Sequence, residues 1–543
     1  MKHFALTIIL SLCFVLTASA QGFFNLTADE VRIDSLLPCF THQMDVGTSY
    51  ADSIYEVSID YPEFIDMSAS DVTLYQRITT DTLPSLPVVD QYIAVERKRG
   101  KLCLSFVPLV FRDGKYQKLV SFKLSVKARP AIMAVRAMRR VAVTPTNRYA
   151  THSVLNNGKW AKISIPETGF YQLTNDLIQQ AGFSNISKVK IYGYGGALQP
   201  EKLTEDYLSS TDDLKEVPTC NFGGHRVFFG VGPVNWATAS TQQRTRNNYS
   251  TAGYYFLTES DGDPLTVDEQ TFRSTYYPHP NDYHSMYEPE EFAWYHGGRN
   301  LYAKSPLSTG DRSYTFTSPS TQGKLSVAMS YDGYCEAAVL LNGTQIGTLT
   351  VDESTVKKGV SYFGNETTYS TMAAYTWSFD LSSLIVGNNT VVLRQTKGTN
   401  INMRLDHITL TFDTPKSLPD LSSVAVPSYV GAIANQDHHA DEAANLIIII
   451  PASRKLQAQA ERLKLLHEQQ DGMSVRIVAA DELYNEFSSG TPDANAYRRY
   501  LKMLYDRAED EAAMPRHLLL LGDCAYDNRM VSGEWSTTKP EDF

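Results

Sequence analysis

The chain has 543 residues, of which 43% are hydrophobic, 11% aromatic and 20% charged, and its net charge is -11. This length allows three or four domains with ordinary cores, and the aromatic content favours β-structure over a helical bundle. The chain is acidic and has no basic stripe, so nucleic acid is not among the partners that we predict.

The first twenty residues have the pattern of an export signal. Lys2 lies in a short polar segment, and the apolar run at residues 4–16 is too short to span a membrane. Residues 18–20 read Ala-Ser-Ala, which fits a cleavage site and leaves Gln21 as the mature N-terminus. We therefore predict a signal peptide at residues 1–20 and export of the chain.

Five cysteines follow this segment and are widely scattered: Cys39, Cys103, Cys220, Cys335 and Cys524. Their odd number leaves at least one thiol unpaired within the chain, and it allows one or two disulfides. The sequence has no C-x-x-C pair, so we expect no cysteine zinc site.

The first half of the chain is predicted to be β-rich. Residues 21–154 contain stretches such as SYADSIYEVSIDYPEF, which alternate with the period of half-buried strands, and the basic segment 130–153 resembles a linker. Residues 155–279 are predicted to form a mixed β domain. Its glycines Gly193, Gly195 and Gly196 lack the spacing of a dinucleotide-binding loop and indicate a turn that needs positive φ.

Residues 280–415 are predicted to form a β-sandwich. Leu325, Val327 and Met329 share one face of a strand, and Asn342-Gly343 is a hairpin signal. Short strands separated by polar turns indicate a jelly-roll or a related sandwich. Residues 416–444 are rich in Pro, Ser and other polar residues and are predicted to be a linker.

The hydrophobic period changes in residues 445–543, where we predict a parallel-sheet α/β domain. NLIIIIP, SVRIVAA and HLLLLGD are the strands, and the first has the continuous apolar run of a strand covered on both faces. A helix is expected from Ser453 to about Gln470, with Gly472 as its stop. The order β-α-β-α-β requires right-handed crossovers. Since such sheets usually have more than three strands, we expect the chain to end inside this domain.

The second helix of this domain is expected to begin at Thr491, as the N-cap, with Pro492 in its first turn. Tyr497, Leu501 and Leu504 would form its buried stripe.

The segments NLIIII, ELYNEFSSGTPDANAYRRYLKMLYDRA and HLLLLGDCAYDNR resemble the start of a gingipain-type cysteine peptidase domain. Upstream, WAKISIPETGFYQLT, IYGYGGALQPE, DDLKEVP, HRVFFGVGPVNW and YSTAGYYFLT occur together and in order. This set resembles the N-terminal region of the type IX secretion system sortases, the PorU-type family. The matches run from about Gly158 to Arg529.

The resemblance implies a cysteine endopeptidase with transpeptidase activity on the cell surface or outer membrane. Such an enzyme removes C-terminal sorting domains from secreted cargo and helps to join the new carboxyl end to lipopolysaccharide. Its partners would be the cargo, an outer-membrane β-barrel component and the lipopolysaccharide, and it would need no cofactor. The mechanism would use a Cys-His dyad and a thioester.

In this family the dyad follows the Leu-Leu-Gly-Asp strand, on later strands of the sheet. We therefore expect the catalytic His and Cys beyond Phe543, no catalytic residue within this chain, and no activity of the chain alone.

Cys524 follows a predicted strand end, where a nucleophile would be placed. It needs a histidine within hydrogen-bond reach. His517 precedes the same strand, so four or five residues at about 3.3 Å each separate the two by roughly 15 Å. The resembling motifs have a small residue at the position of Cys524. Because a small residue suits a tight turn and Cys is small, we interpret Cys524 as a turn residue.

Other histidines and acids suggest sites that we weigh against simpler roles. His296, in WYHGGRN, resembles the active-site His-Gly of this peptidase class but lies far before the α/β domain, so we interpret it as a turn residue. His438 and His439, followed by Asp441 and Glu442, could bind a metal, although we favour a solvated linker.

Asp523 and Asp527 flank the turn after the third strand. They could hold Ca²⁺, and we favour capping of the turn.

Two alternatives stay open at this point. One is a non-enzymatic surface protein whose sandwich binds a glycan or a partner, and the other is a gingipain-like protease that only degrades protein.

Overall fold

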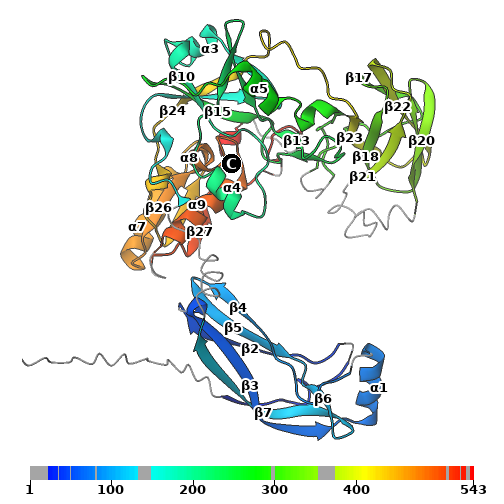
Figure 1. Ribbon diagram of the computed structural model, residues 1–543, viewed down its shortest axis with the longest axis vertical. Helices are drawn as coiled ribbons and strands as arrows, with labels where there is room; N and C mark the ends of the chain where they lie inside the picture. Colours follow the sequence, from blue (N-terminus) through cyan, green and yellow to red (C-terminus); the bar gives the residue numbers. More distant parts are fainter. Residues whose placement is uncertain are drawn as a thin grey trace, which may run out of the picture. The chain divides into compact units, whose positions relative to one another are not determined.

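The computed structural model describes residues 22–34, 36–48, 50–79, 82–131, 148–294, 300–352, 374–508, 513–525, 527–533 and 539–542. The chain forms two compact units, residues 1–145 and 146–543 (Figure 1), and their boundary falls inside the predicted linker 130–153. The predicted signal peptide and His296 lie outside the described residues. Within the described residues, no helix is long and apolar enough to cross a membrane.

The first unit contains two antiparallel sheets, which confirms the β-rich expectation. One sheet has the order β1-β7-β3 with β6 on β7, and the other has the order β2-β5-β4. Apolar residues alternate along these strands, and Leu104, Phe106 and Phe122 meet in the core between them. The elements are β1 (Gly22–Asn25), β2 (Phe40–Gly47), η1 (Tyr50–Asp52), β3 (Ser53–Asp66), α1 (Ala69–Ile78), β4 (Asp90–Glu96), β5 (Arg99–Phe106), β6 (Leu109–Arg112) and β7 (Lys115–Pro130).

The second unit begins with the mixed β domain. Its main sheet has the order β10-β15-β8-β24, and a second sheet has the order β11-β12-β9. The elements are η3 (Val154–Asn156), β8 (Trp160–Ile165), β9 (Gly169–Leu173), α3 (Asn175–Gln180), η4 (Ile186–Lys188), β10 (Val189–Tyr192), α4 (Glu205–Ser210), β11 (Thr219–Phe222), β12 (His225–Gly230), β13 (Val234–Trp236), β14 (Arg244–Arg246), β15 (Gly253–Glu259), α5 (Glu269–Tyr276) and η5 (Pro280–Tyr283).

The predicted linker at residues 416–444 is wrong in its second half. β24 (Ser428–Ile433) pairs with β8 in antiparallel register and completes the main sheet of the mixed β domain. Its alternate residues are only half-buried, so the strand lacks the strong apolar pattern that would have revealed it. The short helix η6 (His438–Ala440) follows and contains a fully buried histidine.

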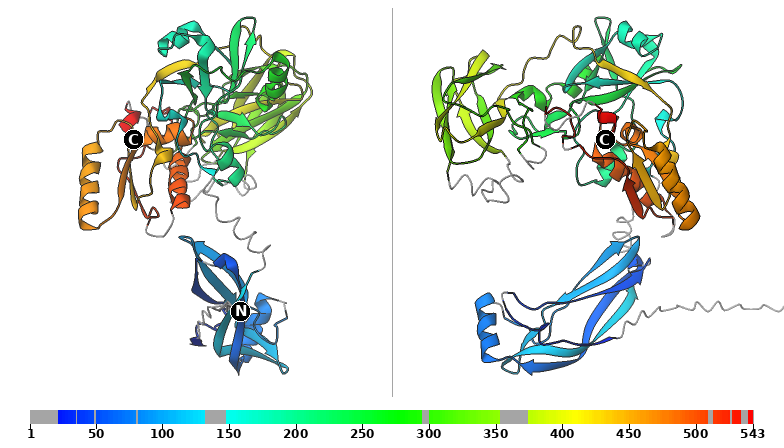
Figure 2. Two further views of the ribbon diagram at one scale, coloured as in Figure 1. Left: turned by 60° about the vertical axis from the view of Figure 1, so that its left-hand side comes forward. Right: turned by 180° about the vertical axis from the view of Figure 1, so that it is seen from behind.

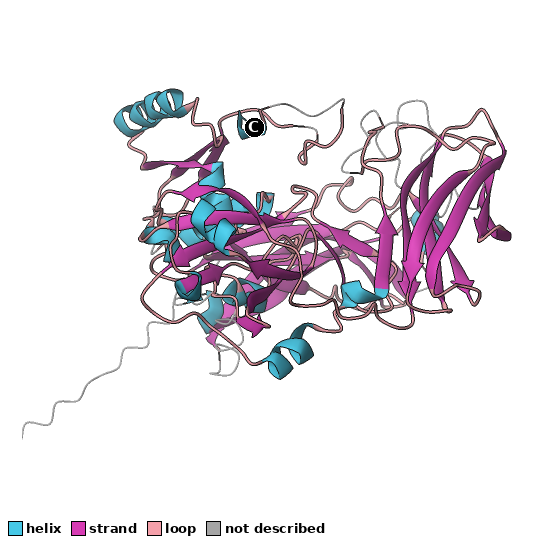
Figure 3. Ribbon diagram, turned by 90° about the horizontal axis from the view of Figure 1, so that it is seen from above, coloured by secondary structure: helices cyan, strands magenta, loops and turns pink. Residues whose placement is uncertain are grey.

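The predicted sandwich is confirmed. Two antiparallel sheets, β16-β23-β18-β21 and β17-β22-β19-β20, face each other (Figure 3). Leu325, Val327 and Met329 are fully buried between them, and Asn342 and Gly343 adopt the positive φ that a two-residue hairpin needs. The strands are β16 (His284–Tyr287), β17 (Arg312–Ser318), β18 (Gly323–Tyr331), β19 (Cys335–Leu341), β20 (Thr344–Val351), β21 (Tyr375–Leu381), β22 (Gly387–Lys397) and β23 (Met403–Phe412).

The α/β domain has three parallel strands, as predicted, and the structure shows their order to be β26-β25-β27. α7 covers one face of the sheet, and α8 with α9 covers the other (Figure 2, left). β25 is buried on both faces, which accounts for its unbroken apolar sequence. The elements are β25 (Leu446–Ile450), α7 (Gln457–Gln470), β26 (Val475–Ala479), α8 (Ala480–Phe487), α9 (Ala494–Arg507), β27 (His517–Leu520) and η7 (Pro540–Asp542).

The start of α9 differs from the prediction. Asp493, and not Thr491, is the N-cap, and its side chain accepts a hydrogen bond from Asn495 N. The Thr491 hydroxyl instead donates to the carbonyl of Gly195 at 3.3 Å, so a contact with another domain replaces the local cap. The buried stripe of α9 includes Leu504, while Tyr497 and Leu501 are only partly buried.

The glycine turn that follows β10 lies against the connection between α8 and α9. Gly193 and Gly195 have positive φ, as predicted, whereas Gly196 is needed for its close approach to Gly253. A Cβ at Gly193 would lie 2.6 Å from Ser489 Oγ, which also accepts a hydrogen bond from Tyr194 N at 3.0 Å. The glycine turn therefore allows the mixed β domain to pack closely against the α/β domain.

All five described cysteines are free thiols, so the disulfides that their number allowed are not formed.

Candidate functional site

The carboxyl ends of the three parallel strands meet at one edge of the α/β sheet, which is where open parallel sheets place their functional groups. Arg454 follows β25, Asp481 and Glu482 lie in the first turn of α8, and Cys524 follows β27. The guanidinium of Arg454 forms ion pairs with Asp481 Oδ1 at 3.1 Å and Glu482 Oε1 at 2.8 Å. At this edge one arginine is therefore paired with two carboxylates.

His438 extends this charge network into the protein. Its Nδ1 lies 2.8 Å from Asp441 Oδ2, and its Nε2 lies 3.2 Å from Glu482 Oε2. Burial alone would lower its pKa, but the hydrogen bonds to Asp441 and Glu482 raise the pKa of His438 to about 10. Burial acts against ionisation of Glu482, yet hydrogen bonds from His438 and Arg454 lower the pKa of Glu482 to about 2.

His439 is fully buried beside Glu486, which is also fully buried. Its Nδ1 lies 2.7 Å from Glu486 Oε2, and its Nε2 lies 3.0 Å from the carbonyl of Asp212. Our expectation that this histidine pair is solvated is thus wrong, because a distant carboxylate holds it in the interior. Both ring nitrogens of each histidine already have partners, which leaves no nitrogen free for a metal.

Cys524 is exposed at the turn after β27, and its backbone N–H donates to Asp523 Oδ1 at 2.8 Å. His517 lies at the opposite end of the same strand. Among the described residues, no histidine is hydrogen-bonded to Cys524. The turn role of Cys524 stays a prediction, and so does the dyad expected beyond Phe543.

Asp527 organises the loop that follows this turn. One oxygen accepts a hydrogen bond from Arg529 N at 3.1 Å, and the other accepts from Val531 N at 2.8 Å and Ser532 N at 2.6 Å. These bonds agree with the predicted cap. Calcium binding at Asp523 and Asp527 stays an untested alternative.

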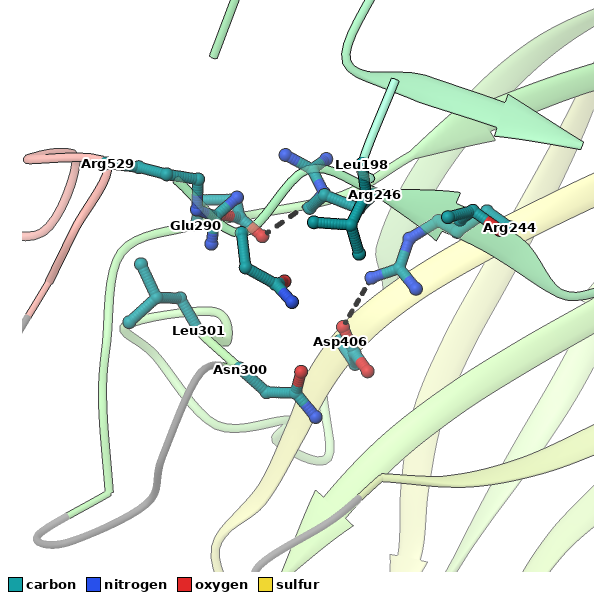
Figure 4. Close-up of a pocket in the computed structure, with 10 residues that line it drawn as sticks. Leu198, Arg244, Arg246, Glu290, Asn300, Leu301, Asp406 and Arg529 are labelled. Atoms are coloured by element: carbon teal, nitrogen blue, oxygen red, sulfur yellow. Dashed lines mark hydrogen bonds and ion pairs between the residues drawn. The ribbon is translucent and has the colours of Figure 1, made fainter. Parts of the chain in front are cut away.

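The same loop carries Arg529 to a cavity of about 260 Å³ that the mixed β domain, the sandwich and the α/β domain line together (Figure 4). Arg244 and Arg246 extend from β14, and Asp406 extends from β23. Leu198 and Leu301 provide apolar side chains, while Asn248 and Asn300 add amides.

Ion pairs hold the arginines of this cavity. Arg244 and Arg246 both bind Glu288, and Arg244 lies 3.4 Å from Asp406 Oδ1. Arg529 binds Glu290. Burial raises the pKa of Glu290 to about 7, against the opposing effect of Arg246 and Arg529.

Glu288, Asp406 and His407 lie close enough to hold a metal ion, since one ligand atom from each lies within 4.8 Å of the others. Two guanidinium groups already neutralise Glu288, however, and they occupy the position that a cation would take. Against burial, which raises it, the two arginines lower the pKa of Glu288. The cluster is therefore an arginine–carboxylate network.

No pattern in the sequence predicted this cavity. One signal was present, because Arg244 and Arg246 alternate along a short strand and so share one face. Their common partner, Glu288, lies 44 residues after Arg244 and 42 residues after Arg246, and a local sequence pattern does not reveal such pairs.

Comparisons with known proteins show what parts of this chain are similar to. Residues 439–540 match the model of peptidase family C25. The crystal structure of dimeric latent PorU from Porphyromonas gingivalis is 26% identical and has a TM-score of 0.57; the match covers 75% of this chain and 45% of that chain. The chain thus spans less than half the length of that PorU. No curated protein matched the chain.

Two carbohydrate-binding modules also match a part of the chain. A family 35 module from an environmental isolate is 18% identical, with a TM-score of 0.17, and the match covers 25% of this chain and 90% of that chain. The CBM36-1 domain of a xylanase from the hindgut metagenome of Trinervitermes trinervoides is 11% identical, with a TM-score of 0.17, and the match covers 24% of this chain and 98% of that chain. Scores of this size support no statement about function.

Proposed function

We propose that this chain, a PorU-type protein of the gingipain family, is part of a cysteine endopeptidase and transpeptidase. The enzyme would cleave C-terminal sorting domains from secreted cargo and aid attachment of the cargo to surface lipopolysaccharide. It would be exported by its signal peptide and would act at the cell surface with an outer-membrane β-barrel partner.

The observation that carries the proposal is the joint match of the peptidase domain and of the β domains before it. The family C25 match covers only residues 439–540, whereas the likeness to PorU covers 75% of the chain. A peptidase domain alone would fit a purely degradative enzyme equally well. The likeness over the additional β domains favours a sortase.

The described residues support a scaffolding role for these β domains. Ser489 and Arg499 of the α/β domain bind the mixed β domain, and Arg499 Nη1 donates to the Tyr194 hydroxyl at 2.9 Å. Arg529 ties the loop after β27 to Glu290. Contacts on two sides of the α/β domain would hold its carboxyl edge in a fixed geometry, which peptide-bond attack requires.

The chemistry would follow from a thiolate and a histidine supplied on later strands. The thiolate attacks the peptide carbonyl, the amine of the sorting domain leaves with a proton from the histidine, and a thioester remains on the enzyme. Attack on the thioester by water would release cargo, and attack by an amine would attach it.

The test uses the complete reading frame that contains this chain and a secreted protein with its sorting domain. We expect a single cleavage before that domain, and we expect alkylation of thiols to abolish it. Efficient cleavage of unrelated unfolded proteins would favour a degradative protease. No turnover in a folded, complete protein would favour the surface-binding alternative.

A further inference from the structure

The cavity contains a donor that the protein itself does not use. Arg529 Nη1 is buried and has no hydrogen-bond partner among the described residues; Arg246 Nε also lacks a hydrogen bond there, although it lies 3.8 Å from Glu290 Oε1. The Arg529 side chain is only 3% exposed, so solvent does not compensate the unused donor. Leaving a buried charged donor unsatisfied costs at least about 1–3 kcal/mol, so a hydrogen-bond acceptor placed in the cavity would be stabilised there.

The charges around the cavity balance only while Glu290 is ionised. Three guanidinium groups, Arg244, Arg246 and Arg529, line the cavity with the carboxyl groups of Glu290 and Asp406, and Glu288 beside it pairs with Arg244 and Arg246. Because burial raises the pKa of Glu290 to about 7, this carboxyl is partly protonated near neutral pH and can donate a hydrogen bond.

The shape and remaining groups limit the size of the occupant. A volume of about 260 Å³ is below the usual range for drug-sized ligands. Asn248 and Asn300 offer further amide donors, and the structure shows no hydrogen bond that uses either side chain within the described residues. Guanidinium forks match the paired oxygens of carboxylates and phosphates.

We propose that this cavity binds a small oxyanion, a carboxylate or phosphate group, through Arg529 and Arg246. The site lies among the β domains and the loop after β27, and none of its residues is assigned a step in the proposed peptidase chemistry. An oxyanion here would bridge β14 and that loop, and so it would strengthen the junction of the three domains.

Isothermal titration of the whole chain with acetate, inorganic phosphate and sulfate, each against chloride at equal ionic strength, tests the site. Acetate represents a carboxylate, and the two tetrahedral anions represent a phosphate group. We expect saturable one-to-one binding of at least one class at concentrations up to about 10 mM. Absence of binding by all three would mean that water alone fills the cavity, and it would overturn the proposal.

Arg529→Lys is the decisive variant. It keeps the charge opposite Glu290 but removes the guanidinium fork, so we expect oxyanion binding to weaken about tenfold. Arg394→Lys, an exposed arginine paired with Asp311 on the sandwich, is the matched control and should bind like the wild type. Equal affinity of Arg529→Lys and wild type would refute the assignment.

Glu290→Gln provides a variant that gains function. The groups that face Glu290 are Arg246 on β14, Glu288 after β16 and Arg529 after β27, and Asp406 lines the same cavity from β23. Removing the carboxylate should tighten sulfate binding near pH 8 and remove the weakening that we expect for the wild type between about pH 6 and pH 8. Sulfate keeps its charge over this range. Unchanged affinity and pH dependence in Glu290→Gln would contradict the proposed site.

Discussion

Replacement of His438 by asparagine tests the buried charge network of the α/β domain. The variant removes the imidazolium between Asp441 and Glu482, but these carboxylates keep other partners. Arg476 Nη1 lies 2.8 Å from Asp441, and Arg454 Nη2 lies 2.8 Å from Glu482. We therefore expect the variant to fold.

The magnitude follows from the pKa of His438, which rises from 6.5 to about 10 on folding. A group with a raised folded-state pKa stabilises fully below its unfolded pKa, and it loses this effect as pH rises through its folded pKa. For these two values, the contribution of His438 to the free energy of unfolding falls by about 3 kcal/mol between about pH 6 and about pH 9. On the acid side, the depressed pKa of Glu482 means that its contribution is lost as pH falls below about 4.5 toward about 2.

Urea unfolding followed by circular dichroism at 222 nm provides the assay, because the longest helices of the second unit, α7 and α9, belong to the α/β domain. The difference in unfolding free energy between wild type and His438→Asn should be large near pH 6 and about 3 kcal/mol smaller near pH 9. His467→Asn, which removes a partner of Asp471 at the surface end of α7, is the control. A His438→Asn difference that does not change with pH would refute the reasoning.

Three further changes test other features. Asp527→Asn places an amide against the N–H groups of Val531 and Ser532; it should cost about 1–3 kcal/mol and speed hydrogen exchange in residues 527–533, whereas an equal effect of EDTA on the wild type would instead support calcium. Gly195→Ala should lower the unfolding free energy by more than about 1 kcal/mol in urea titrations, because φ is +85° and the new Cβ would lie 2.4 Å from the Val231 carbonyl. Cys524→Ala should leave the thiol-dependent turnover of the complete enzyme unchanged; its loss in a folded variant would show that Cys524 acts in catalysis.

Local patterns predicted the elements whose burial is regular. β25 reads as a buried strand because both of its faces are covered, and Asn342-Gly343 specifies a hairpin through its backbone conformation alone. β27 was predicted as the third strand, but Leu518 and Leu520 are 45% and 53% exposed. Four consecutive leucines predict a strand, and they do not tell whether a neighbouring element covers it.

The features that the sequence did not predict depend on residues far apart in the chain. His439 is buried by Glu486, which is 47 residues away, and its other nitrogen meets a carbonyl 227 residues away. The cavity likewise combines β14, β23 and the loop after β27. In the sequence, polar residues at such junctions look like those of solvated loops. Their hydrogen-bond partners lie far away in the chain and reach them only when the chain folds.

The position of β24 has a consequence for the order in which the chain folds. β24 pairs with β8 across more than 250 residues, as in the register of Ser428 with Ser164, so the main sheet of the mixed β domain closes around an inserted sandwich. The first and last strands of the sandwich are neighbours, since His284 of β16 pairs with Thr411 of β23, and the two ends of the sandwich therefore lie close together. Once the sandwich has folded, the loop that β8 and β24 must close is effectively much shorter, and the entropic cost of closing it falls. During synthesis the main sheet must therefore wait for the sandwich, and slow or failed folding of the sandwich would leave the free edge of β8 open to wrong partners.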